Sequence, residues 1–268
     1  MKQIGVLLIV IALVAFVFSG VFSPDRSIFP LVNWWRAIFD SNNEQVSEYK
    51  NNFNETYNSQ INEIEIDVVS SHIEIMVDDS LSDIKVTYQG NGEFDVSESK
   101  DSLKIEEDFN KWNLGSVRKG NLVIKLPQGV DEIILSTVSG NIELEDLRGD
   151  LLEINNVSGR TILDNVEFEK IEVENISGRI QANNIIFSNG FLKNVSAGIS
   201  VKVNSVWDEF SIETVSGDVD LTLDPKISPN ITYSSVSGKL TSRVSSGEKN
   251  NCDLEIDTVS GDATVKTN

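Results

Sequence analysis

The sequence predicts an all-β fold, a parallel β-solenoid (β-helix) of about 19–23 residues per coil, preceded by an N-terminal transmembrane helix. Three observations predict this fold: a repeated Val/Ile-Ser-Gly motif, apolar residues at alternate positions around it, and an uncharged apolar run near the N-terminus. A fixed period near twenty residues is typical of solenoids, in which each repeat forms one coil stacked on the last.

The Val/Ile-Ser-Gly motif occurs seven times in the second half of the chain, at steps of 19, 19, 19, 20, 21 and 23 residues. Six copies are exact, and the fourth carries an inserted Ala197, which predicts a bulged corner. The copies begin at Val138, Val157, Ile176, Val195, Val215, Val236 and Val259.

Strands are predicted on both sides of each motif. Apolar residues stand three and five positions before each Val or Ile, and only Gly190 interrupts this column. The alternation resumes after the motif, as in Ile142 and Leu144, and such a pattern indicates strands with one buried face. We expect the motif glycine to form the corner, because glycine reaches positive φ without a Cβ clash. An Asp/Asn-rich second turn and a short third strand then close each coil.

Stacking such coils at about 4.8 Å aligns equivalent residues into columns. We expect the small polar residues before the motif to bond to one another along the stack, as polar ladders do in cross-β structures: Thr137, Asn156, Asn175, Asn194, Thr214, Ser235 and Thr258. The seven motif serines are interpreted as structural, because a catalytic serine would be one unique copy with a base beside it. No catalytic, cofactor-binding or metal-binding residue is assigned.

Residues 61–130 are predicted to form an irregular β region that caps the solenoid, and residues 131–268 its regular repeats. Residues 62–75 have the pattern of a degenerate coil, with Val69-Ser70-Ser71 in place of the motif. Alternating segments between 84 and 126 favour antiparallel hairpins. Trp112 would lie at the tip of a loop, either as an exposed binding anchor or as a lid over the end of the core.

The N-terminal 60 residues predict a membrane tether. Residues 4–22 carry no charge over 19 residues, about 28 Å of helix, which favours a transmembrane anchor at 1–23. A cleaved signal peptide is the alternative, although its apolar region is usually shorter. Residues 24–40, with Trp34 and Trp35, are predicted as an interfacial amphipathic segment or as a segment packed on the solenoid end. Residues 41–60 are predicted as a polar linker.

The formal net charge of −20 excludes nucleic acid as a partner, since nucleic-acid binding requires basic patches. The single cysteine, Cys252, cannot form an internal disulfide, and it is interpreted either as buried or as a free thiol. Five glycosylation sequons occur, at Asn54, Asn156, Asn175, Asn194 and Asn230. The three at 156, 175 and 194 fall on the motif, where an internal polar ladder explains the asparagine better than sugar attachment does.

Two segments with the signature Thr-Val-Ser-Gly-Asp, at residues 214–218 and 258–262, resemble the DUF4097 family of adhesin-like bacterial domains. The segment Leu126-Pro127-Gln128-Gly129-Val130 is similar to the lead-in of the same family. The resemblance covers residues 62–268 and implies a β-solenoid at the cell envelope, with a link to envelope stress responses. The family has no established catalytic residues, so none is transferred.

These patterns together favour a non-catalytic, membrane-anchored cell-envelope protein, an adhesin-like scaffold or an envelope-stress sensor component. We expect a single-pass protein with an extracytoplasmic solenoid, a protein or cell-wall polymer as partner, and self-association through the C-terminal solenoid edge. The alternative is a β-helix enzyme acting on cell-surface polysaccharide, but His72 is the only histidine and no coil carries a distinctive acidic cluster. Glu143 with Glu145, or Asp218 with Asp220, would bind calcium or form a solvated face.

Overall fold

The computed structural model describes residues 52–107, 120–244 and 252–268, which all belong to one compact unit. These residues form an all-β fold, as predicted, and within them no helix is long and apolar enough to span a bilayer. The predicted transmembrane anchor, the interfacial segment and Trp112 lie outside the described residues. The strands are β1 (Phe53–Tyr57), β2 (Glu63–Val68), β3 (His72–Val77), β4 (Ile84–Gly90), β5 (Phe94–Glu98), β6 (Ser102–Glu107), β7 (Gly120–Leu126), β8 (Glu132–Thr137), β9 (Ile142–Glu145), β10 (Arg148–Asn156), β11 (Thr161–Asp164), β12 (Glu167–Asn175), β13 (Ile180–Asn194), β14 (Ile199–Thr214), β15 (Val219–Leu223), β16 (Pro229–Ser235), β17 (Leu240–Arg243), β18 (Cys252–Thr258) and β19 (Ala263–Thr267).

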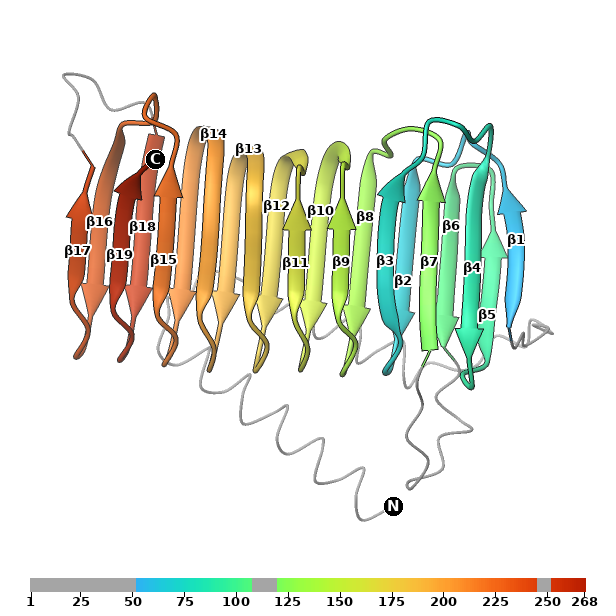
Figure 1. Cartoon of the computed structure of the whole chain (residues 1–268), viewed down its shortest axis with the longest axis horizontal. Helices are drawn as coiled ribbons and strands as arrows, with labels where there is room; N and C mark the ends of the chain where they lie inside the picture. The colour runs from blue at the N-terminus through green and yellow to red at the C-terminus, as the bar shows by residue number, and fades with distance from the viewer. Residues whose placement is uncertain (1–51, 108–119, 245–251) are drawn as a thin grey trace, which may run out of the picture. The chain divides into compact units, whose positions relative to one another are not determined.

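The strands lie in two rows, and outside the cap the arrows of the two rows point in opposite directions (Figure 1). In the cap, β4 and β5 run against the other strands of their rows. Row A holds the strands before each motif, in the order β5, β6, β2, β8, β10, β12, the second half of β13, the second half of β14, β18 and β16. Row B holds those after each motif, in the order β1, β4, β7, β3, β9, β11, the first halves of β13 and β14, β15, β19 and β17. From β6 to β16 and from β7 to β17 the pairing is parallel, with equivalent residues of neighbouring coils opposite each other, which is consistent with a solenoid.

The third side of the coil is shorter than the predicted third strand. It pairs two residues per coil, such as Glu167 and Phe168 with Ile186 and Phe187. The break at Gly190 also has a physical reason here. A Cβ on Gly190 would lie 2.5 Å from the ring of Phe187, which packs on Phe210 with ring centroids 4.9 Å apart. The missing side chain therefore makes room for two aromatic rings in the core.

The motif corners lie along one edge of the stack. Each motif serine donates its backbone N–H to the carbonyl of the Val or Ile in the adjacent coil, at 2.8–3.1 Å. The serine hydroxyl donates to the same carbonyl in most coils, for example from Ser177 to Val157 at 3.2 Å and from Ser260 to Val215 at 3.2 Å. The serine column is therefore structural, because its hydroxyls are used to join one corner to the next.

The corner glycine is required by close packing rather than by positive φ, which corrects the sequence interpretation. Among the motif glycines only Gly159 has φ in the left-handed range, at 147°. A Cβ on Gly178 would overlap the carbonyl oxygen of Gly159, and a Cβ on Gly217 would overlap that of Ala197. Ala197 thus occupies the glycine position of the fourth copy. Gly198 stands where Arg179 and Asp218 stand in the adjacent coils, so this corner has no extra residue and the predicted bulge was wrong.

The polar column before the motif is buried except for Ser235. It was expected to bond to itself along the stack, but its side chains bond mainly to the corner backbone, and Thr258 with Ser235 at 2.8 Å is an exception. The side-chain amide of Asn194 donates to the carbonyl of Gly178 at 2.7 Å, and that of Asn156 donates to the carbonyls of Gly140 and Gly159 at 3.3 Å. Asn156, Asn175 and Asn194 are at most 3% exposed, so these sequons are inaccessible to glycosylation in the folded protein.

The last coil in sequence is not the end of the stack, so the expected C-terminal edge was wrong. Strand β18 pairs with both β14 and β16, and β19 pairs with both β15 and β17. Burial agrees with this order, because the inward residues Leu254 and Ile256 of β18 are buried whereas Ile231 and Tyr233 of β16 are only partly buried. The edge coil is β16–β17.

The opposite end is a cap of antiparallel strands, as predicted, and the coil β2–β3 lies inside it. Parallel pairing with β8–β9 confirms that residues 62–75 form a degenerate coil. The predicted linker 41–60 was too long, because β1 pairs with β4 and buries Phe53 against Tyr88 and Phe94. The Glu107 carboxylate accepts the N–H groups of Val69 and Ser70, at 2.8 and 3.4 Å, and so replaces the corner of a further coil.

Two glycine substitutions test the packing of the corners. Gly178→Ala should lower the free energy of unfolding by about 1–3 kcal/mol, because the added Cβ forces adjacent corners apart. Gly198→Ala is the matched control, since its Cβ would meet nothing nearer than the Asp218 carbonyl oxygen at 3.3 Å. Denaturant unfolding of both variants gives the comparison, and equal losses would contradict the role of the corner column.

Candidate binding surface

Among the described residues, no three His, Cys, Asp or Glu side chains are arranged to hold a metal ion. The carboxylate of Asp218, a candidate calcium ligand, accepts the backbone N–H of Asp262 at 3.0 Å, and Asp262 accepts that of Lys239 at 2.9 Å. These two aspartates therefore join adjacent corners. His72 contacts the Asn141 carbonyl at 3.1 Å and Glu74 at 3.1 Å. Cys252 is buried, as the first of its two interpretations holds.

The outer sides of the two rows differ strongly in charge. We call the outer side of row A, from β6 to β18, the acidic face. It carries thirteen carboxylates and only three lysines, which are Lys104, Lys170 and Lys193. The carboxylates are Glu63, Glu65, Asp67, Glu106, Glu132, Glu153, Glu172, Glu174, Glu209, Glu213, Asp253, Glu255 and Asp257. The outer side of row B, from β7 to β17, is nearly balanced, with Glu74, Glu143, Glu145, Asp164 and Asp220 against Lys125, Lys202, Lys266 and Arg243. The excess negative charge of the strands is therefore on one side.

Like charges lie close together on the acidic face because strand register aligns them. Glu174, Lys193, Glu213 and Asp257 stand on four successive strands, and Lys193 Nζ lies 3.4 Å from Glu213 Oε2. Burial raises the pKa of Glu174, and the carboxylates around it add to the rise although Lys193 opposes it. Burial and then Glu255 and Glu213 also raise the pKa of Asp257. A cation bound at this face would therefore stabilise the charged form of these carboxylates.

Asp67 shows the same crowding near the capped end of the acidic face. Burial, followed by the charge of Glu65, raises the pKa of Asp67 to about 6. Lys104 opposes the rise, but it is already shared between Glu65 at 3.2 Å and Glu106 at 3.1 Å. One lysine thus serves three carboxylates, which leaves this cluster with net negative charge at neutral pH.

A groove of about 850 Å³ follows the second corner of the coils, away from the motif corners. Asp146, Asn165 and Asn184 line it with φ of 54–56°, and their side chains form a ladder with two hydrogen bonds of 3.0 Å. This confirms the predicted Asp/Asn turn. The side-chain amides of Asn165 and Asn184 each donate one hydrogen bond within the ladder. The groove therefore offers a ligand fewer polar groups than its lining residues contain.

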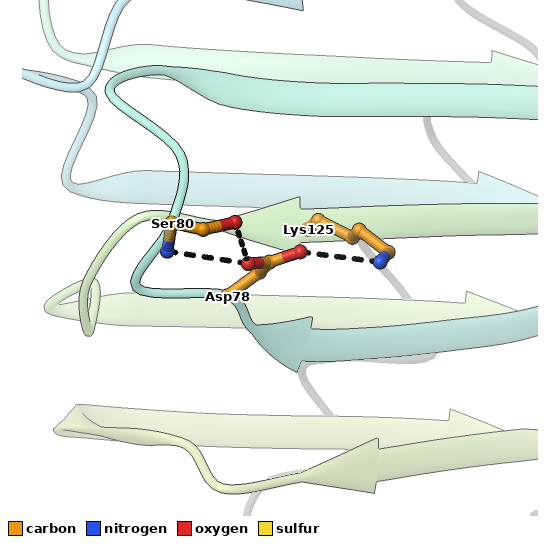
Figure 2. A network of polar contacts seen from close by, with 3 residues as sticks. All are labelled: Asp78, Ser80 and Lys125. Atoms are coloured by element: carbon orange, nitrogen blue, oxygen red, sulfur yellow. Dashed lines mark hydrogen bonds and ion pairs between the residues drawn. The ribbon is translucent and has the colours of Figure 1, made fainter.

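A polar network beside this groove ties the end of β3 to β7 (Figure 2). Asp78 accepts the N–H and the hydroxyl of Ser80 at 3.2 and 2.5 Å, and its second oxygen lies 3.2 Å from Lys125 Nζ. These hydrogen bonds, that of the Ser80 hydroxyl first, lower the pKa of Asp78. These contacts give Asp78 a structural role, because they hold the turn that follows β3.

The raised pKa of Asp67 predicts a pH dependence of stability. Because the folded-state pKa is above the ordinary value of 3.8, protonated Asp67 favours the folded state, and this contribution is lost as pH rises through about 6. Asp67→Asn should therefore show a smaller fall in melting temperature between about pH 4 and 7 than the unchanged chain. Thermal unfolding across this range measures it, and parallel profiles would contradict the crowding.

Solved structures of other proteins are similar to this one. The structure is similar to a candidate adhesin from Bacteroides fragilis at 14% identity and a TM-score of 0.50, over 82% of this chain and 98% of that chain. It is also similar to a candidate lipid-binding protein from Parabacteroides distasonis at 17% identity and a TM-score of 0.40, over 81% and 97% of the two chains. A search of curated proteins finds no match. The family description Toastrack DUF4097 matches residues 61–268, and the chain belongs to this family.

Proposed function

We propose that this chain is a non-catalytic, adhesin-like binding protein of the bacterial cell envelope, and that the acidic face binds a partner carrying several positive charges. The observation that supports this proposal is the imbalance of thirteen carboxylates against three lysines on one side of the strands. A face of this kind attracts basic partners by long-range electrostatics and repels acidic ones.

The rigid register of row A favours multivalent binding. Parallel pairing fixes Glu153 opposite Glu172, and Glu213 opposite Asp257, at the strand spacing of about 4.8 Å. Each exposed ion pair with a partner contributes little by itself. Several pairs formed together on a pre-organised face lose little additional conformational entropy, so a partner with a matching series of cations binds more tightly than its single contacts indicate.

The proposal includes a membrane tether, supported by the uncharged run at residues 4–22. The β domain would then lie outside the cytoplasm, either as an adhesin-like scaffold or as a component of an envelope-stress sensor. The absence of enzyme activity is part of the same proposal. The corner serines join adjacent coils, and the acidic face repeats its carboxylates over many strands without a distinct catalytic pair.

Equal charge changes on the two rows test this function. The triple variant Glu153→Gln, Glu172→Gln and Glu255→Gln removes three charges from the acidic face. Glu143→Gln, Glu145→Gln and Asp220→Asn is the matched control on row B, where all three residues are exposed. With an oligolysine peptide as probe, the first variant should raise Kd about tenfold or more and the control less than about threefold.

Titration calorimetry of the full chain at low salt measures both constants. Equal weakening by the two variants would show that binding follows net charge and not the acidic face, and would overturn the proposal. Release of new reducing ends from a cell-surface polysaccharide by the full chain would instead support the enzyme alternative.

A further inference from the structure

The two ends of the hydrophobic core are closed to different degrees. At the capped end, Phe53, Tyr88 and Phe94 pack with ring centroids 4.2–6.0 Å apart and are at most 7% exposed. In the edge coil β16–β17, the inward residues Ile231, Tyr233 and Leu240 are only partly buried, and Val236 at the corner is 81% exposed. The core is therefore sealed at one end and partly open at the other.

The edge coil also has unpaired strand edges. Within the described ranges β16 pairs only with β18 and β17 only with β19, so one side of each strand has no ladder partner (Figure 1). Natural sheets usually protect such an edge with charged side chains, a bulge or an internal proline. β16 has no charged residue and its proline is Pro229 at the first position, and β17 carries only Arg243, at its last position. This edge is thus suited to pairing.

Charge opposes a second copy of the chain less at this edge than over the acidic face. The chain as a whole carries −20, which opposes contact between copies over most of its surface. Residues 225–244, which contain the edge coil, have no Asp or Glu and carry Lys226, Lys239 and Arg243. Two copies that meet here bring these three cations of each copy toward each other, which is less like charge than the acidic face would bring together, and they cover apolar side chains on both sides.

We propose that the edge coil β16–β17 is a homodimer interface in which two copies join their open core ends about a two-fold axis. β16 and β17 run in opposite directions and belong to different rows (Figure 1). One two-fold axis perpendicular to the rows therefore pairs β16 with β16 and β17 with β17 of the second copy, both antiparallel. Ile231, Tyr233 and Leu240 of both copies then line the contact. If a residue of one copy meets a second residue of its partner, the reverse contact also forms, as an isologous interface requires.

Sedimentation velocity of the full chain in a neutral detergent tests the proposal, at about 0.05 M and about 0.5 M salt. We expect a dimer that strengthens with salt, because screening reduces repulsion between two acidic copies while the contact is apolar and backbone-mediated. Tyr233→Asp should raise the dissociation constant at least about tenfold. Val236→Asp should act in the same direction without disturbing the core, because that side chain is 81% exposed.

Trp207→Asp is the control, since Trp207 is another large exposed apolar residue, at 59%, and lies outside the edge coil. It should leave the dimer unchanged, and far-UV circular dichroism shows whether each variant is folded. A monomer at both salt concentrations would overturn the proposal, as would a dimer that Val236→Asp leaves intact or that only Trp207→Asp weakens. A dimer that weakens with salt would point to ion pairs between basic and acidic regions and would equally overturn it.

Discussion

The fold depends on the contact between a corner glycine and the carbonyl oxygen of the corner beside it. Parallel strands lie about 4.8 Å apart, so corners with the same path must stack at that distance. Only a hydrogen atom fits between Gly178 and the carbonyl of Gly159. Once the corners are this close, serine N–H groups and hydroxyls reach the adjacent carbonyls, and the buried asparagines reach the glycine carbonyls. The Val/Ile-Ser-Gly motif is therefore one hydrogen-bonding unit.

The same register determines the chemistry of the surface. Because equivalent residues of successive coils lie opposite each other, a carboxylate on one strand lies beside the carboxylate of the next coil, as with Glu153 and Glu172. Like charges directly opposite on neighbouring strands are destabilising. The raised pKa values of Glu174 and Asp257 express this cost together with burial. A cationic partner would offset the repulsion, so the strain of the acidic face and its proposed binding function have one cause.

Much of the fold was readable from the sequence, since a period near twenty and a fixed motif specify coil, corner and core. The order of the coils was not, because every copy has nearly the same pattern and therefore fits nearly every neighbour. A signal existed in the residue after the glycine, where Asp218 accepts from Asp262 and Asp262 from Lys239. Strand β1 was missed because Phe53 and Tyr57 stand in an Asn-rich segment, and their partners on β4 and β5 are distant in sequence.

The candidate surface was only partly predictable, for a related reason. The alternation shows which residues of a strand face outward, but the sequence interpretation chose Glu143, Glu145 and Asp220, which lie on the nearly balanced row B. The charge of a face becomes apparent only when strands from all coils are assigned to one row.

That assignment also links the two proposals. A two-fold axis perpendicular to the rows keeps row A of both copies on the same side, so dimerisation would join two acidic faces into one longer surface. A polycationic partner spanning both faces would then bind with the avidity of two linked sites.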